Sequence, residues 1–170
     1  MCKFMKSLLL ITFVFLFSFI VNAQNYKYEF EDKCGSPEVE SQIYRQHFGK
    51  VLNIADDNTL KVKDKFGKKW TVELAGIDLT QNDDEIKRIL TDKILDKNVE
   101  FSGNPEKGKS KYLEAIIRIG ELEINRFLIE KGFSKFKNTD YGYSVSRYTL
   151  CAYNQLEEIA QKSKLGIWAK

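Results

Sequence analysis

The sequence predicts an α+β protein in which five strands form a small barrel accompanied by three helices. Three observations support this. Between Gly49 and Asp78, apolar residues alternate with polar ones in three short runs, the pattern of half-buried strands. A run with helical spacing follows, and two further strand-like runs come after it. The end of the chain then returns to helical spacing.

The first three strands are expected to form a meander of two hairpins. The alternating runs are Val51–Ala55, Leu60–Val62 and Trp70–Leu74. Asp56-Asp57-Asn58 separates the first two runs, and Asp64-Lys65-Phe66-Gly67 separates the second from the third. Both linkers have turn-forming residues, and the second offers a glycine for a positive φ.

A helix is expected next, because Asn82-Asp83-Asp84-Glu85 is a capping sequence and apolar residues then recur at helical spacing until about Lys97. The remaining predicted elements are a strand beginning at Val99 and Phe101, a strand over Tyr112–Ile119, and helices over Glu123–Lys131 and Val145–Lys164. Five strands with a helix after the third are the arrangement of an OB-fold barrel.

The N-terminal segment is expected to be a signal peptide. Lys3 and Lys6 precede an apolar run of about thirteen residues, Leu8–Ile20, and Val21–Ala23 has the small residues of a cleavage site. A membrane anchor is the alternative, but the run is shorter than the roughly twenty residues that span a bilayer. We therefore expect residues 1–23 to be removed and the protein to be exported, periplasmic or secreted, with no stable membrane anchor.

Cleavage after Ala23 changes the charge and the cysteine content. The formal charge falls from +3 to +1, because two lysines and no acid are lost, so composition alone does not indicate a nucleic-acid-binding protein. Only Cys34 and Cys151 remain, and an even pair in an oxidising compartment favours a disulfide. Two free thiols are the alternative. Two cysteines and one histidine are poor material for a zinc site.

From Phe48 to Lys170 the chain resembles the thermonuclease (staphylococcal-nuclease-like) family. The resemblance rests on the meander ending in Gly76-Ile77-Asp78, on Gly132-Phe133-Ser134 after the short helix, and on Lys164-Leu165-Gly166-Ile167-Trp168 after the last helix. Asn125 also occupies a position that is usually polar in the family. The resemblance implies a thermonuclease-like OB-fold domain over residues 48–170, preceded by an extension over residues 24–47.

The resemblance also implies a mechanism, the hydrolysis of a phosphodiester with one calcium ion. In the family two aspartates hold the ion, a glutamate orients the attacking water, and two arginines stabilise the charge that develops on the phosphate. Calcium prefers hard, anionic oxygens. Guanidinium groups match phosphate oxygens in paired hydrogen bonds.

Among the implied metal ligands, one aspartate is kept as Asp78, but the other is replaced by Asn58. Asn58 offers an oxygen without a charge, which weakens calcium binding, and Asp57 is a possible neighbouring ligand. Glu73 acting as a new ligand beside Asp78 and Asp57 would rebuild the site, and this alternative stays open. Calcium is therefore expected only if the protein is active.

The implied catalytic positions are also substituted. The glutamate is replaced by Gln81, and the two arginines by Glu73 and Tyr112. Lys109 and Lys111 lie near the Tyr112 position if the register of the preceding loop shifts. Losing one preorganised charge-stabilising donor costs on the order of 10²–10³ in rate, and a carboxylate facing a phosphate repels it. We therefore assign no catalytic residue, and whether the protein is an enzyme stays open.

The second hairpin carries the candidate nucleic-acid contacts, Lys61, Lys63, Lys68 and Lys69. Such a surface on an OB-fold suits the phosphate backbone of a single strand. The alternative is a solvated edge that discourages sheet pairing. The lone His47, before the first expected strand, is expected to be structural or exposed. Trp70 and Trp168 are expected in the core rather than as stacking platforms for bases.

Three functions are consistent with these residues. We favour an exported thermonuclease-like module that has lost most or all nuclease activity and binds nucleic acid or another ligand. The second is a calcium-dependent endonuclease that hydrolyses DNA or RNA through an altered site. The third is an interaction protein of the envelope, built around residues 24–47 and the pair Cys34 and Cys151.

Overall fold

The computed structural model describes residues 34–35, 45–55, 59–78, 83–103, 112–137 and 146–169. Residues Pro37–Lys170 form one compact unit, and only residues 34–35 of the other unit, Met1–Ser36, are described. The predicted signal peptide and most of the predicted extension lie outside the described residues. No helix in the described ranges is both long enough and apolar enough to cross a membrane.

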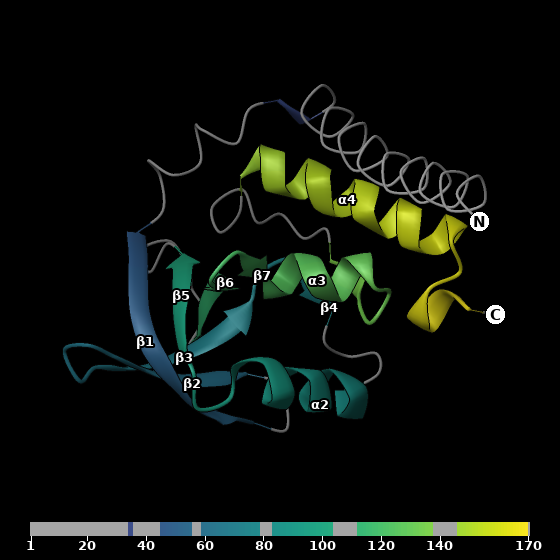
Figure 1. Ribbon diagram of the computed structural model, residues 1–170. Coiled ribbons are helices and arrows are strands. Elements are labelled where there is room, and N and C mark those ends of the chain that lie inside the picture. The colour runs from purple at the N-terminus through teal and green to yellow at the C-terminus, as the bar shows by residue number, and fades with distance from the viewer. Residues whose placement is uncertain are drawn as a thin grey trace, which may run out of the picture. The chain divides into compact units, whose positions relative to one another are not determined.

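Five strands close into a barrel, which confirms the predicted fold class (Figure 1). The meander consists of β1 (Arg45–Ile54), β2 (Leu60–Asp64) and β3 (Lys69–Leu74). β5 (Asn98–Gly103) pairs antiparallel with β1 and with β6 (Leu113–Ile119). β6 then pairs in parallel with β3, and this last pairing closes the barrel. With a helix after the third strand, this is an OB-type barrel.

The three predicted helices are confirmed, each slightly shorter than expected. They are α2 (Asp83–Ile94), α3 (Ile124–Glu130) and α4 (Arg147–Lys162). The remaining elements are the short strands β4 (Ile77–Asp78), β7 (Leu122–Glu123) and β8 (Lys135–Phe136) and the 3-10 turn η2 (Gly166–Trp168). β4 and β8 pair with each other outside the main sheet. The sequence did not predict these short strands, because two residues carry no alternation.

The core follows the predicted periodicities. Val51, Leu60 and Val72, one from each strand of the meander, are completely buried. α2 packs on β1 and α3 packs on β6, whereas α4 packs mainly on α3. The apolar faces of these helices include the buried residues Ile86, Leu90 and Ile94 of α2, Ile124 and Leu128 of α3, and Leu156 and Ala160 of α4. Outward residues of the strands are free to serve a surface function.

β1 begins at Arg45, so the last residues of the predicted extension belong to this strand. β1 pairs with β2 on one side and β5 on the other, and Gly49 lies close to the backbone of β2. A Cβ at Gly49 would lie 2.6 Å from the Lys63 carbonyl oxygen and 2.8 Å from Val62 Cγ1. Only glycine fits there without a backbone shift.

His47 packs with aromatic residues of the barrel. Its ring centroid is 4.8 Å from that of Trp70 and 5.2 Å from that of Phe101. Phe101 is fully buried, whereas His47 and Trp70 are half-buried. These three rings pack together, as expected for a structural His47 and a packed Trp70. Trp168 is also half-buried, with the Lys135 ammonium 5.3 Å from its ring centroid.

Cys34 and Cys151 are joined by a disulfide, as the even cysteine count predicted. Cys151 is a half-buried residue of α4. Disulfides form and persist in oxidising compartments. The bond is therefore compatible with an extracellular location.

Candidate functional site

The described positions that the thermonuclease resemblance implies as catalytic or metal-binding lie on or next to three elements. Glu73 is on β3, Tyr112 directly precedes β6, and Asp78 ends β4. All three are half-buried. Asp57, Asn58 and Gln81 lie outside the described residues.

Glu73 has a second carboxylate as its neighbour on the adjacent strand. Its register partner across the parallel β3–β6 pair is Glu114. Val72 and Leu74 are buried in the barrel, so Glu73 between them faces outward. Leu113 and Ala115 are likewise buried, so Glu114 between them also faces outward. The two carboxylates therefore lie on one face of adjacent strands, where they repel an anionic phosphate.

Asp78 is held by backbone interactions. It is the register partner of Lys135 in the β4–β8 pair, and the Ser134 hydroxyl donates to its carbonyl oxygen at 2.6 Å. In the part of the chain that the structure describes, no group of three or more His, Cys, Asp and Glu side chains could hold a metal ion. Within the described residues, Glu73 and Asp78 therefore do not belong to such a group.

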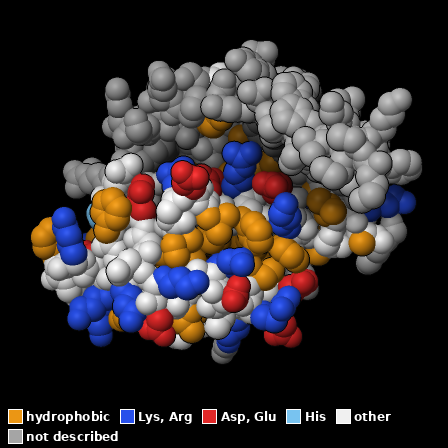
Figure 2. All heavy atoms as spheres, in the orientation of Figure 1, with side chains coloured by type: hydrophobic (Ala, Val, Ile, Leu, Met, Phe, Trp, Pro, Cys, Tyr) orange, Lys and Arg blue, Asp and Glu red, His pale blue; other side chains and the backbone are white. Residues whose placement is uncertain are grey.

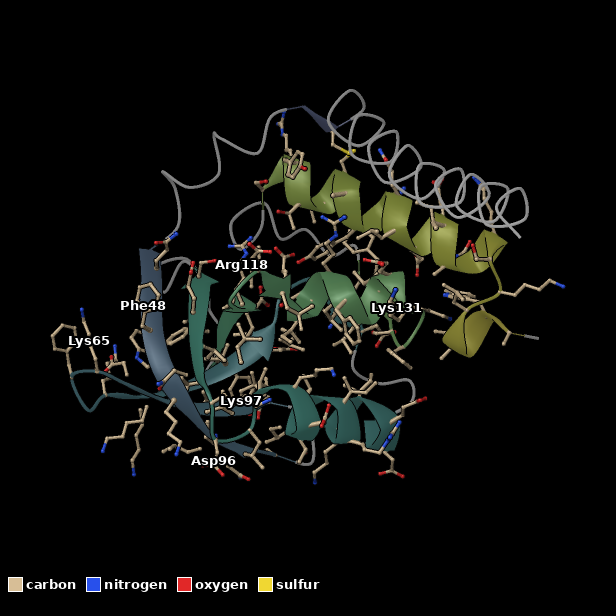
Figure 3. The ribbon with its side chains drawn as sticks, in the orientation of Figure 1. Phe48, Lys65, Asp96, Lys97, Arg118 and Lys131 are labelled. Carbon is tan, nitrogen blue, oxygen red and sulfur yellow. The ribbon has the colours of Figure 1, made fainter. Side chains whose placement is uncertain are left out.

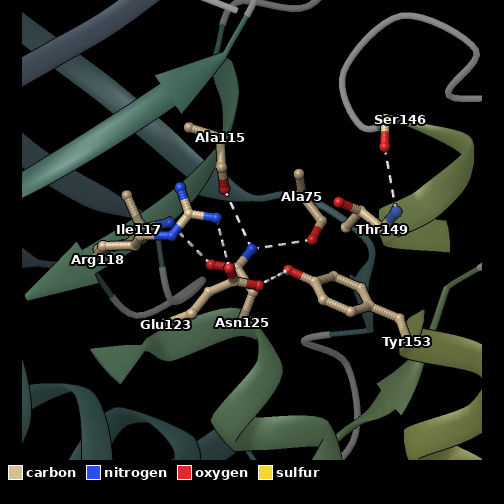
Figure 4. A network of polar contacts seen from close by, with 9 residues as sticks. All are labelled: Ala75, Ala115, Ile117, Arg118, Glu123, Asn125, Ser146, Thr149 and Tyr153. Carbon is tan, nitrogen blue, oxygen red and sulfur yellow. Dashed lines mark hydrogen bonds and ion pairs between the residues drawn. The ribbon is translucent and has the colours of Figure 1, made fainter. Parts of the chain in front are cut away.

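Asn125 is structural, and Figure 4 shows its contacts. Its side-chain nitrogen donates to the carbonyl oxygens of Ala75 at 2.9 Å and Ala115 at 3.2 Å, and its side-chain oxygen accepts from the Ile117 amide at 3.0 Å. The side chain is completely buried. It therefore joins α3 to β6 and to the turn after β3.

Glu123 lies at the centre of a second polar cluster (Figure 4). Its carboxylate accepts from Arg118 at 2.7 Å and from the Tyr153 hydroxyl at 2.7 Å, which connects β6, β7 and α4. Burial works to lower the pKa of Arg118, but the charges of Glu123 and then Glu100 outweigh it and leave that pKa raised. Arg118 is therefore a fixed cation on β6.

The lysines of β2 do not protect a sheet edge. β2 pairs with β1 on one side and with β3 on the other, so the edge interpretation of Lys61 and Lys63 is wrong. Both lysines are exposed on the outer face. Lys61 donates to the Thr71 hydroxyl at 2.9 Å.

Three lysines lie in a row across the meander. Lys50 of β1 is the register partner of Lys63, and Lys63 is also the register partner of Lys69 of β3. All three are exposed, and like charges directly opposite one another on a sheet are unfavourable. Lys50 forms an ion pair with Asp96 at 3.1 Å. We call Lys50, Lys63 and Lys69 the lysine row.

The turn after β2 is built around Asp64. One carboxylate oxygen of Asp64 accepts from the amides of Phe66 and Lys68, both at 2.9 Å, and the other accepts from the Trp70 indole at 2.9 Å. These hydrogen bonds lower the pKa of Asp64, and the bond from Trp70 has the largest effect. The Lys68 ammonium lies 3.4 Å from the Trp70 ring centroid, so this lysine covers the indole instead of standing free.

A groove that the sequence did not predict lies on the outer face of β1, β2, β5 and β6. Its volume is about 820 Å³, and Phe48, Lys50 and Leu52 of β1 line it. Figure 3 shows Phe48 and Lys65, two lining residues, on the same side of the barrel. Figure 2 shows Lys and Arg side chains gathered at the left of the view, near the β2–β3 hairpin, with hydrophobic side chains beside them. The sequence offered one signal for this groove, the aromatic residue Phe48 before the expected first strand.

Comparison of the chain with protein-family models and with curated proteins finds no match. The resemblance to thermonucleases therefore rests on the sequence motifs given above, and its functional implications enter as proposals.

Proposed function

We propose that this protein is an exported, thermonuclease-like barrel that binds single-stranded nucleic acid and has lost phosphodiester hydrolysis. The observation that carries the binding is the lysine row on the outer face of the meander. It supplies exposed positive charge on a barrel of the type that often binds single strands.

Electrostatics supports an anionic ligand at this row. Opposite Cβ atoms on paired strands are about 4.5–5.5 Å apart, so the like charges of Lys63 and Lys69 lie on neighbouring side chains, while Lys50 is already paired with Asp96. An anion bound between Lys63 and Lys69 is attracted to both cations at once. Phosphate groups spaced along a strand are such anions, and their binding releases counterions and depends on salt.

The loss of hydrolysis is supported by Glu73 and Glu114. In the family, as the resemblance implies, arginines stabilise the transition state. Here two carboxylates lie side by side on β3 and β6. Removing one charge-stabilising donor costs on the order of 10²–10³ in rate, and adding negative charge opposes the reaction further. A nuclease of the family type is therefore disfavoured, although Asp78 is kept.

Export is supported by two features. The first is the N-terminal sequence, with two lysines, a short apolar run and small residues before Gln24. The second is the disulfide between Cys34 and Cys151. A protein in such a compartment would meet nucleic acid outside the cytoplasm.

Binding of a labelled 16-nucleotide single strand, followed by fluorescence anisotropy between 50 and 200 mM salt, tests the proposal. We expect affinity to fall steeply with salt. Lys63→Ala and Lys69→Ala should each reduce the slope of log K against log salt by about 0.7. Lys131→Ala is the matched control, because Lys131 is exposed after α3, away from the hairpin (Figure 3). Absence of salt-dependent binding, or equal effects of all three variants, would contradict the proposal.

A further inference from the structure

Phe48 is an exposed aromatic residue on a strand that lies inside the sheet. Its side chain is 53% exposed, although β1 has partners on both sides. The neighbouring inward position, Gly49, is buried, so Phe48 faces out. Leu52, on the same strand, is 43% exposed and lines the same groove. The groove thus has an apolar floor on its β1 side.

Positive charge borders this apolar floor. Lys50, Lys63 and Lys65 all line the groove. Lys63 opposes Lys50 across β1 and β2, and the turn that follows β2 carries Lys65 on the same side of the barrel as Phe48 (Figure 3). The first two belong to the lysine row, so the groove and the row are parts of one continuous surface.

The acids of the groove are already engaged. Asp64 accepts three hydrogen bonds within its own turn. Glu100 lies opposite Arg118 in the β5–β6 register, and its charge helps to raise the Arg118 pKa. Asp64 keeps its negative charge, but Lys63 and Lys65 outnumber it at the hairpin end of the groove, and this excess of positive charge favours an anionic ligand.

The size and composition of the groove suit a flat apolar group attached to an anion. Its volume, about 820 Å³, is within the range of about 300–1,000 Å³ that ligand sites occupy. Nucleobases are such groups, and each base has a face that stacks on an aromatic ring. In a duplex these faces are covered by neighbouring bases, which leaves only single strands able to use Phe48.

We propose that this groove is the base-binding part of the surface, with Phe48 as the stacking platform, Leu52 beside it, and Lys63 and Lys65 contacting the phosphates on either side of the stacked base. This inference rests on the proposed function and adds the residues that select single strands over duplexes. The groove does not include Glu73 or Asp78, so it is separate from the positions implied by the thermonuclease resemblance.

The test compares Phe48→Ala with Phe66→Ala by anisotropy, using a labelled 16-nucleotide single strand and a duplex of the same sequence. Phe66 is 84% exposed at the hairpin tip and does not line the groove, but its ring centroid lies 5.1 Å from the Lys65 ammonium, so Phe66→Ala is the control for removing an exposed ring beside the same lysine. We expect Phe48→Ala to weaken single-strand binding by roughly 5- to 150-fold, the loss of one stacked base, and Phe66→Ala to weaken it less than twofold. Phe48→Trp should retain binding.

The salt slope separates stacking from charge. Phe48→Ala should leave the slope of log K against log salt unchanged, whereas Lys63→Ala should lower it by about 0.7. Duplex binding should be weak and insensitive to Phe48. Equal melting temperatures of the variants would show that folding is intact.

Several outcomes would overturn the inference. Single-strand binding unaffected by Phe48→Ala would refute the stacking platform and leave the proposed function standing. No binding of the wild type to any strand would refute both. Binding to vesicles of phosphatidylglycerol that is stronger than binding to the oligonucleotide, and that is lost in Phe66→Ala, would assign the surface to anionic lipid instead.

Discussion

Glu73 of β3 and Glu114 of β6 are register partners in the parallel pair that closes the barrel. The closure itself depends on backbone hydrogen bonds and on the buried neighbours Val72, Leu74, Leu113 and Ala115. The outward side chains can therefore vary without opening the barrel. Outward charges on these strands can thus change while the fold is kept, which is what the proposed loss of hydrolysis requires.

Removing the charge of Glu114 should stabilise the protein. We expect Glu114→Gln to raise the free energy of unfolding by roughly 0.2–1 kcal/mol, because like charges opposite each other on adjacent strands repel. Urea denaturation at low salt and at 1 M NaCl measures this, and the gain should shrink at high salt. Glu121→Gln, in an exposed turn, is the control and should change stability little. A destabilised Glu114→Gln would contradict the assigned repulsion.

Asn125 should be among the polar residues whose replacement destabilises the protein most. Asn125→Ala leaves two buried carbonyl oxygens and one amide without this partner, so we expect a loss of about 2–4 kcal/mol in the free energy of unfolding. Chemical denaturation provides the measurement. Asn154→Ala, on the exposed face of α4, should change stability by about 0.5 kcal/mol or less. Similar losses in both variants would show that the buried network is unimportant.

Gly49 should not tolerate a side chain. The Cβ of alanine would approach the Lys63 carbonyl, a backbone atom that cannot rotate away. We expect Gly49→Ala to reduce the free energy of unfolding by about 1–3 kcal/mol. The control is Asn53→Ala on the exposed face of the same strand. A neutral Gly49→Ala would mean that β1 and β2 pack less closely than the Cβ distances indicate.

The pKa of Asp64 provides a pH test. Its folded-state pKa is lowered, with the hydrogen bond from Trp70 as the largest cause, so its contribution to stability is present above the unfolded pKa and is lost as pH falls through the folded pKa. Trp70→Phe should move the Asp64 pKa back up towards 3.8. Carbon-detected NMR titration of the carboxyl group measures this, and an unchanged pKa would refute the indole hydrogen bond.

The disulfide determines how many reactive thiols the protein should have before and after reduction. Protein that begins at Gln24 should have no reactive thiol before reduction and two after it, whereas the uncleaved chain also contains the thiol of Cys2. Reduction should lower the melting temperature, because the chain-entropy model assigns roughly 5 kcal/mol to so long a loop. Thiol titration with and without reductant measures the first effect, and thermal unfolding measures the second. Two reactive thiols before reduction would contradict the bond.

The strands and helices were predictable because their apolar residues follow regular periods. The fifth strand, expected over Tyr112–Ile119, is observed over Leu113–Ile119, and the last helix differs by two residues at each end. The start of β1 was not predictable, because Arg45–Phe48 is polar except for its final residue, and an outward Phe48 breaks the rule that apolar residues face the core.

The candidate site was predictable only in part. Lys61 and Lys63 were identified from the hairpin sequence, but their sheet neighbours depend on a register across three strands. For the same reason, neither the lysine row nor the pairing of Glu73 with Glu114 could be deduced. Local periodicity places a side chain on a face, whereas only the tertiary pairing determines which side chains lie opposite it.

The central claim is that the protein binds a single strand without cutting it. The most direct measurement incubates the labelled 16-nucleotide strand, as DNA and as RNA, with folded protein in millimolar calcium or in chelator, and determines binding and strand length together. We predict a bound strand that keeps its full length under both conditions. Calcium-dependent cleavage that disappears in Asp78→Ala would contradict the account and assign the protein to the active nucleases.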